Sequence, residues 1–167
     1  MIGCVLVLLF LAAAPPGESP TVDLSGRWIP DPAAYESRKE LKNPDPAAPP
    51  PAVTPEPGRL IISGKGEFLV FELLDKEGTP ISTTKVSTGG ETTMNPRAGG
   101  DLAHASKSRW EGRALITQWR LTRGDAEVMR GTDRWELSQD RSTLTLIGTT
   151  EDTKSRSRSK TVYRRER

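Results

Sequence analysis

Short apolar or alternating runs follow one another from residue 58 to the C-terminus, with turn signals about every ten residues. The breaks include GKG, DKEGT and NPRAGG, whose Gly, Pro and Asn residues favour turns. No helical period of useful length appears in this part of the chain. The pattern predicts an all-β fold, an antiparallel up-and-down β-barrel of about eight to ten strands. The runs assigned to strands are 59–63, 67–74, 80–88, 91–94, 101–110, 113–122, 127–137, 142–150 and 155–164.

Turn lengths fix which side chains share a face, because side chains alternate along a strand. A two-residue turn at 111–112 pairs His104 with Trp119 and Leu102 with Leu121. This register separates apolar side chains from charged ones. The inner face holds Leu102, Trp110, Leu115, Trp119 and Leu121, and the outer face holds Lys107, Arg109, Gln118 and Arg120.

The next turn can contain two or three residues, and the two choices give opposite faces. A two-residue turn would place Arg130 and Arg134 inside, so we predict a three-residue loop at 123–125. A four-residue loop at 139–142 then carries the inner face into the following strand. These loops place Met129, Gly131, Asp133, Trp135 and Leu137 inside, with Leu144, Leu146 and Gly148 beside Leu137, Trp135 and Asp133.

The last hairpin gives the inner wall a polar side, because it turns a row of hydroxyl groups inward. Ser155, Ser157, Ser159, Thr161 and Tyr163 fall inside, and Arg156, Arg158, Lys160 and Arg164 fall outside. Buried hydroxyl groups without partners cost about 1–3 kcal/mol each, so this row indicates a cavity that holds water or a ligand. The predicted ligand-binding residues are His104, Ser106, Ser108, Thr117, Trp119, Asp133, Trp135, Ser157, Ser159 and Tyr163.

The N-terminal part divides into a first strand at 20–29 and a proline-rich insertion at 30–57, with 58–167 forming the rest of the barrel. Nine of the fourteen prolines lie in this insertion, which excludes a strand there. Asp31 followed by Pro32 favours a short helix at its start. The remainder is typical of a polyproline-like spacer, either over the barrel mouth or as a loop.

Residues 2–14 form an uncharged apolar run that is short for a membrane span. We interpret 1–19 as a signal peptide and the protein as exported, periplasmic or extracellular; an uncleaved membrane anchor is the alternative. The only cysteine, Cys4, leaves with this segment, so the mature chain has no disulfide.

The candidate chemistry does not favour an enzyme. His104 is the only histidine, and Ser106 and Asp133 share its face without a nucleophile-elbow pattern. One histidine without clustered carboxylates provides no metal site, and no cofactor is expected. We expect Asp133 to pair with Arg113, either structurally or as an anchor for a charged ligand group.

The C-terminal segment 154–167 carries seven cationic residues and one acid, although the net charge of the chain is only +2. The cations can form a solvated exterior that protects an exposed strand edge. They can also attract an anionic envelope surface through Arg156, Arg158 and Lys160. Nucleic-acid binding is not expected, because Tyr163 is the only aromatic residue among these cations.

The Gly26-x-Trp28 step ahead of a long meander resembles the first strand of lipocalin and calycin barrels. Together with RWEGRALITQWRLTRGDAEV, RWELSQDRSTLTLIG and KTVYRR, it is similar to exported bacterial lipocalin-like proteins of unassigned function. The resemblance implies that Trp28 closes the barrel end under a cationic side chain, Arg164 or its neighbour Arg165. A contact of this kind is worth about 0.5–2 kcal/mol.

These observations predict a non-catalytic barrel that binds a small hydrophobic or amphiphilic molecule between its tryptophan wall and its hydroxyl wall. The alternative is an envelope interaction or structural protein that uses the basic outer strand.

Overall fold

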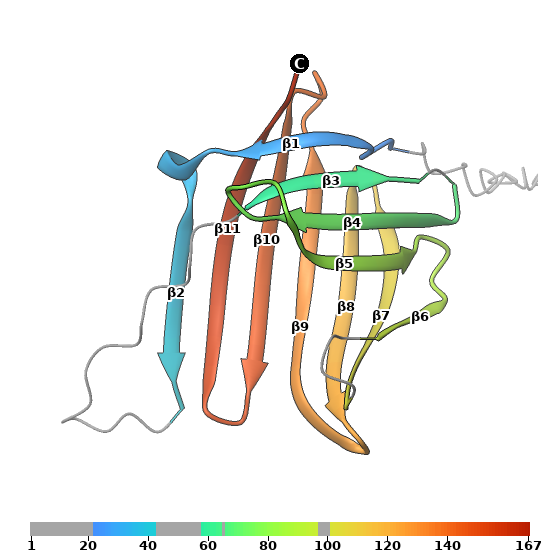
Figure 1. The fold of residues 1–167 in the computed structure, drawn as a ribbon, viewed down its shortest axis with the longest axis vertical. Helices are drawn as coiled ribbons and strands as arrows, with labels where there is room; N and C mark the ends of the chain where they lie inside the picture. The colour runs from blue at the N-terminus through green and yellow to red at the C-terminus, as the bar shows by residue number, and fades with distance from the viewer. Residues whose placement is uncertain (1–21, 43–57, 65, 97–100) are drawn as a thin grey trace, which may run out of the picture.

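The computed structural model describes residues 22–42, 58–64, 66–96 and 101–167, whose strands form one antiparallel sheet curled into a nearly closed barrel (Figure 1). The predicted all-β barrel is confirmed. Its strand order is β5-β4-β3-β1-β11-β10-β9-β8-β7-β6, and β2 pairs with β11. The strands are β1 Gly26–Pro30, β2 Glu36–Leu41, β3 Arg59–Ser63, β4 Phe68–Leu74, β5 Pro80–Ser87, β6 Thr92–Pro96, β7 Leu102–Glu111, β8 Ala114–Arg123, β9 Ala126–Leu137, β10 Thr143–Asp152 and β11 Ser155–Arg165.

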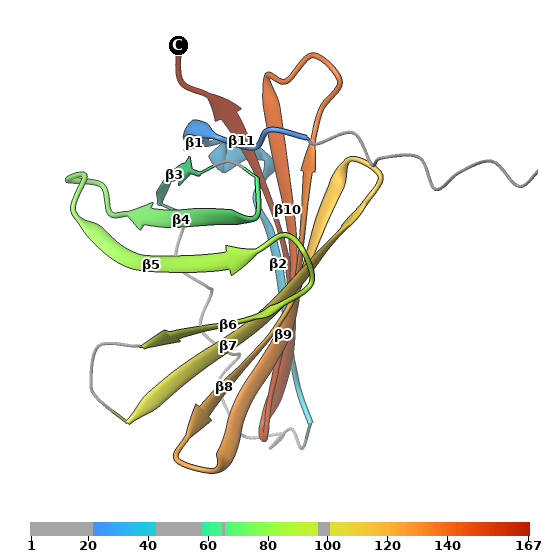
Figure 2. The same cartoon turned by 90° about the vertical axis from the view of Figure 1, so that its right-hand side faces the viewer.

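The strands lie in two directions. In Figure 1, β1, β3, β4 and β5 run across the upper part of β7–β11, and Figure 2 shows β3–β5 projecting to one side of them. The apolar faces of the two groups meet where they cross, because each strand alternates buried and exposed positions. The buried hydrophobic core contains Leu24, Trp28, Leu60, Ile62, Leu69, Phe71, Val86, Leu115, Trp135, Leu137, Leu144 and Tyr163.

The start of the proline-rich insertion differs from the prediction. Asp31 caps a helix as expected, since its Oδ1 accepts a hydrogen bond from the Ala33 amide at 3.2 Å. The helix is only a 3-10 turn, Pro32–Ala34, and the chain continues as β2. The exclusion of a strand was therefore wrong. Pairing with β11 outweighs the helix propensity of this segment, because tertiary contacts override local preference. Residues 43–57 lie outside the described part.

The β7–β8 hairpin keeps the predicted faces with a different pairing. Glu111 pairs with Ala114, so the turn lies at 112–113, and His104 faces Leu121 instead of Trp119. The pairing has moved by two positions along β8. Because side chains repeat every two residues, each one stays on its predicted face.

The β8–β9 connection reaches the predicted faces by another route. Arg123 pairs with Ala126, which leaves a two-residue turn in place of the expected three-residue loop. Opposite the step from Leu121 to Thr122 in β8, the pairing passes from Met129 to Glu127, so β9 holds one extra residue, Val128, which restores the inward direction of the rest of β9. The expected pairing of Gly148 with Asp133 in the next hairpin is confirmed.

Trp28 is buried at the end of the barrel beneath Arg165, whose guanidinium carbon lies 4.3 Å from the indole centroid. Of the two predicted candidates, Arg165 makes this contact and Arg164 does not: Arg164 is exposed and donates to Asp31 Oδ2 at 2.8 Å. Gly26 makes the stacking possible, because a Cβ atom there would lie 2.5 Å from Arg165 Nη1. Its φ of +146° also disfavours other residues.

The two ends of the sheet, β5 and β6, meet through side-chain hydrogen bonds. The side-chain carboxamide of Asn95 donates from Nδ2 to the Lys85 backbone carbonyl and accepts at Oδ1 from the Lys85 backbone N–H, both at 2.8 Å. The Ser87 amide donates to Thr93 Oγ1 at 3.0 Å. Asn95 therefore replaces one step of a backbone ladder where the barrel closes.

Candidate functional site

A cavity of about 190 Å³ lies inside the barrel, where β4 and β5 cross β7, β8 and β9. Five of the predicted ligand-binding residues come together around it, and β4 and β5 supply the opposite wall. The lining is formed by Phe71, Thr84, Val86, His104, Thr117, Trp119, Asp133 and Trp135.

Sequence reasoning missed the wall from β4 and β5, since face assignment began only with the strand now labelled β7. Part of the signal was present in the chain, because Thr84 and Val86 lie on either side of the charged Lys85. In β4 residues 68–71 form an unbroken apolar run, and only the structure shows that Leu69 and Phe71 are its buried members. Pairing of Phe71 with Thr84 places them on one face.

Aromatic rings form much of the cavity wall. The ring centroids of Phe71 and Trp135 are 4.9 Å apart, and those of His104 and Trp119 are 5.8 Å apart. Trp135 also lies 6.5 Å from the ring of Tyr163. Gly131 allows the indole of Trp119 to lie against β9, because a Cβ atom there would be 2.4 Å from Cζ2.

Asp133 brings a carboxyl group into this aromatic setting. It pairs across the sheet with Thr117 and Gly148, and a Cβ atom on Gly148 would lie 3.3 Å from Asp133 Oδ1. The expected pair with Arg113 is not formed. The two-position change in register carries Arg113 away, and its guanidinium donates to the Leu137 and Ser138 carbonyls instead.

Burial raises the pKa of Asp133 from 3.8 to about 6, and the Trp119 side chain opposes part of the rise. The Trp119 contact is weak, because Nε1 forms no well-aligned hydrogen bond with any described residue. Asp133 retains some accessible surface because it borders the cavity. Within the described ranges, no lysine or arginine lines the cavity.

The hydroxyl groups predicted to line the site are only partly directed at the cavity. Ser108 Oγ and Thr117 Oγ1 satisfy each other at 2.9 Å, while Ser106 Oγ is buried without a hydrogen-bond partner among the described residues. Ser157 and Ser159 are absent from the cavity lining and border a groove between β10, β11 and β2. Ser159 Oγ nevertheless lies near Asp133, because a Cβ atom on Gly148 would lie 3.2 Å from Ser159 Oγ and 3.3 Å from Asp133 Oδ1.

Tyr163 lies behind Trp135 and is absent from the cavity lining. Burial and the nearby charge of Asp133 raise the pKa of its hydroxyl. The structure therefore brings together His104, Thr117, Trp119, Asp133 and Trp135 of the predicted set. The ligand-binding role of these residues stays a prediction.

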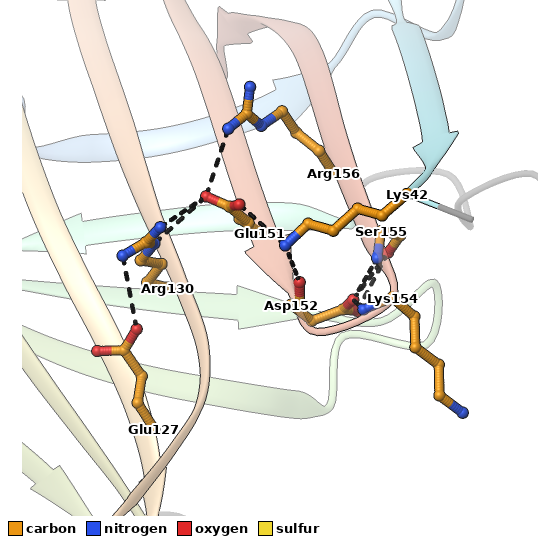
Figure 3. A network of polar contacts seen from close by, with 8 residues as sticks. All are labelled: Lys42, Glu127, Arg130, Glu151, Asp152, Lys154, Ser155 and Arg156. Atoms are coloured by element: carbon orange, nitrogen blue, oxygen red, sulfur yellow. Dashed lines mark hydrogen bonds and ion pairs between the residues drawn. The ribbon is translucent and has the colours of Figure 1, made fainter.

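A larger hollow of about 680 Å³ borders β7–β10, and its lining combines outer residues such as Arg120 and Arg130 with Ser106 and Trp119 of the predicted site. Beside it, Glu151 is surrounded by Lys42, Arg130 and Arg156 at N–O distances of 2.9, 3.1 and 3.5 Å (Figure 3). Hydrogen bonds from Lys42 and then Arg130 lower the pKa of Glu151 to about 2. Lys42 Nζ also donates to the Asp152 carbonyl at 2.6 Å, so this network joins the end of β2 to the β10–β11 hairpin.

The basic row Arg156, Arg158 and Lys160 does not border an exposed edge, because β11 lies between β10 and β2. The edge-protection hypothesis is therefore wrong. Lys160 Nζ pairs with Glu36 Oε1 at 3.2 Å, and Arg156 pairs with Glu151. Binding of an anionic surface by this row stays a prediction.

The described residues include no helix that is long and apolar enough to cross a membrane. They also include no group of three or more His, Cys, Asp or Glu side chains arranged to hold a metal ion.

No protein-family model matches the chain, and no curated protein matches it. Among solved structures, it is similar to one described as the REP1-NXSQ fatty acid transporter, with a TM-score of 0.50 and 11% identity over 86% of this chain and 96% of that one. A mutant of the fluorescent protein UnaG has a TM-score of 0.43 and 20% identity over 65% and 71% of the two chains. The first comparison supports the lipocalin-like barrel as a fold, and at this identity it assigns no residue roles.

Proposed function

We propose that this protein is an exported, non-catalytic barrel that binds a small, partly apolar molecule in its internal cavity. The observation that carries the proposal is the Asp133 carboxyl, which faces a cavity walled by Phe71, Trp119 and Trp135. The apolar run at residues 2–14 supports export.

The energetics of Asp133 support a bound ligand. A carboxyl in an apolar cavity loses hydration, which the elevated pKa reflects. Proteins tolerate such a group where it performs a function, and a cavity with apolar walls and few polar groups is the common form of a small-molecule site.

The fold supports a carrier, since the similar solved structure is described as a fatty acid transporter. The ligand here is expected to be smaller than a long acyl chain. A volume of about 190 Å³ corresponds to roughly six water molecules, or to a molecule somewhat larger than benzene.

The polar groups of the site support binding without catalysis. A serine hydrolase needs its serine hydroxyl hydrogen-bonded to the histidine. Ser106 Oγ makes no hydrogen bond with any described residue. His104 and Asp133 therefore lack an activated nucleophile beside them.

Tryptophan fluorescence tests the proposal. The mature protein is titrated with small ring compounds, and mass spectrometry under native conditions identifies molecules that co-purify with it. Binding is expected to change the emission, and Trp119→Phe or Trp135→Phe should remove most of that change. Trp110→Phe is the matched control, because Trp110 does not line the cavity. Saturable fluorescence changes that persist in both cavity variants, or the absence of any bound small molecule, would contradict the proposal.

A further inference from the structure

Resting on the proposed function, we infer that the ligand is a small organic cation: an amine with a ring-sized apolar body, whose ammonium group binds the Asp133 carboxylate within the aromatic wall.

The charges around the cavity favour a cation. Among the described residues that line the cavity, Asp133 is the only carboxylate and none is a lysine or arginine. The nearest candidate on the facing strand, Arg113, is occupied by the Leu137 and Ser138 carbonyls. A buried carboxylate is costly unless it is paired, so a ligand that supplies a positive charge gains more than a neutral one. A carboxylate ligand would add a second negative charge and be repelled.

The aromatic wall favours the same ligand. Ring faces attract cations, and clusters of rings are a known way to recognise ammonium groups. Elsewhere in the molecule, rings already have side-chain cations: Arg165 stacks on Trp28, and Lys85 Nζ lies 4.1 Å from the Phe68 centroid. No described residue supplies a cation of this kind to Phe71, Trp119 or Trp135.

The cavity volume limits the body of the ligand. About 190 Å³ exceeds the roughly 150 Å³ that accommodates benzene, so one ring with a short amine arm fits. Phe71, Val86 and Trp135 can surround the ring, and Thr84 and Thr117 line the same cavity as the carboxylate. 2-Phenylethylamine has this size and charge.

Protons compete with the amine for Asp133. Affinity is expected to be constant at neutral pH and to fall about tenfold for each pH unit below about 6, where the carboxyl is protonated. The other titratable groups facing this region are His104 on β7 and Tyr163 on β11. His104→Gln should therefore leave the acidic loss of affinity in place.

Calorimetric titration with three compounds of matched shape tests the inference at pH 7.5: 2-phenylethylamine, 2-phenylethanol and 3-phenylpropionate. The amine is expected to bind at least about tenfold more tightly than the alcohol, and the acid more weakly than both. Asp133→Asn should remove the preference for the amine while leaving the alcohol within about threefold. Asp125→Asn, in the exposed β8–β9 turn, is the matched control.

The outcomes separate the two proposals. Equal or tighter binding of the alcohol or the acid overturns the cation inference and leaves the barrel as a binding protein. Failure of all three compounds to bind, with no co-purified molecule, counts against both. Near-ultraviolet circular dichroism verifies that Asp133→Asn is folded. If it is not, the pH series on the unchanged protein decides, and an affinity for the amine that does not fall below pH 6 overturns the inference.

Discussion

Replacement of Asp133 by Asn is expected to stabilise the ligand-free protein at neutral and alkaline pH. Burial holds the carboxyl pKa at about 6, against 3.8 for an ordinary aspartate. The folded state therefore keeps a proton that the unfolded chain has released between pH 4 and 6. By linkage, the stability contributed by this group falls as the pH rises through that window, and the full cost is present above pH 6.

The size of the effect follows from the same two values. A rise from 3.8 to about 6, at about 1.36 kcal/mol for each pH unit, corresponds to at most about 3 kcal/mol. The asparagine amide is nearly isosteric with the protonated carboxyl and carries no charge. The free energies of unfolding of the two proteins should therefore agree at pH 4 and differ by up to about 3 kcal/mol at pH 8.

Urea unfolding monitored by tryptophan fluorescence at pH 4, 5, 6, 7 and 8 measures the difference. The contributions of all other titrating groups cancel when the free energy of unfolding of the variant is compared with that of the parent. Asp125→Asn controls for the loss of an exposed carboxylate. A variant that is less stable than the parent at pH 8, or a difference that does not change with pH, would refute the reasoning. Either result would mean that groups around the cavity already stabilise the ionised Asp133 carboxylate.

Three further substitutions test the frame around the site. Gly26→Ala should destabilise by about 1–3 kcal/mol and shift tryptophan emission to the red, because its Cβ would displace Arg165; unchanged urea midpoints would count against this packing. Asn95→Leu removes two hydrogen bonds to Lys85 and should cost about 1–3 kcal/mol, with faster amide exchange in β5 and β6; exchange that stays slow there would rule out this closure. The pKa of Glu151 is lowered to about 2, so the stability it contributes is lost as pH falls below about 4.5. In Glu151→Gln, the free energy of unfolding measured with urea should fall less steeply below pH 4.5 than in the parent. An unchanged fall would contradict the ion network.

The pattern of the chain was enough to predict the strands and their faces. The runs at 59–63 and 155–164 appear as β3 and β11 with nearly unchanged limits. Trp119, Asp133 and Trp135 turn inward as predicted, although two turns were assigned incorrectly. The errors did not exchange the faces, because an inner residue remains inner under any even shift and the bulge in β9 compensated for an odd one.

The cavity could be predicted only in part. Alternation places a residue on a face without fixing its position along the strand, so Ser157 and His104 were equivalent in the sequence. The crossing of β4 and β5 over one end of β7–β9 separates them, since only residues beneath that crossing line the cavity. Asp133 lost its predicted partner because the β8–β9 register places it opposite Thr117, four positions from Arg113.

The sequence by itself determined the strand positions from residue 59 onward and the inward or outward direction of the side chains on β7–β11, because these follow from local apolar periodicity and turn residues. The tertiary structure alone decided which strands meet at a distance. Pairing of β2 with β11 and the stacking of Arg165 on Trp28 join segments far apart in the chain, and the contact between β5 and β6 joins the two ends of the sheet. Such contacts depend on the curvature of the whole sheet, which no local pattern specifies.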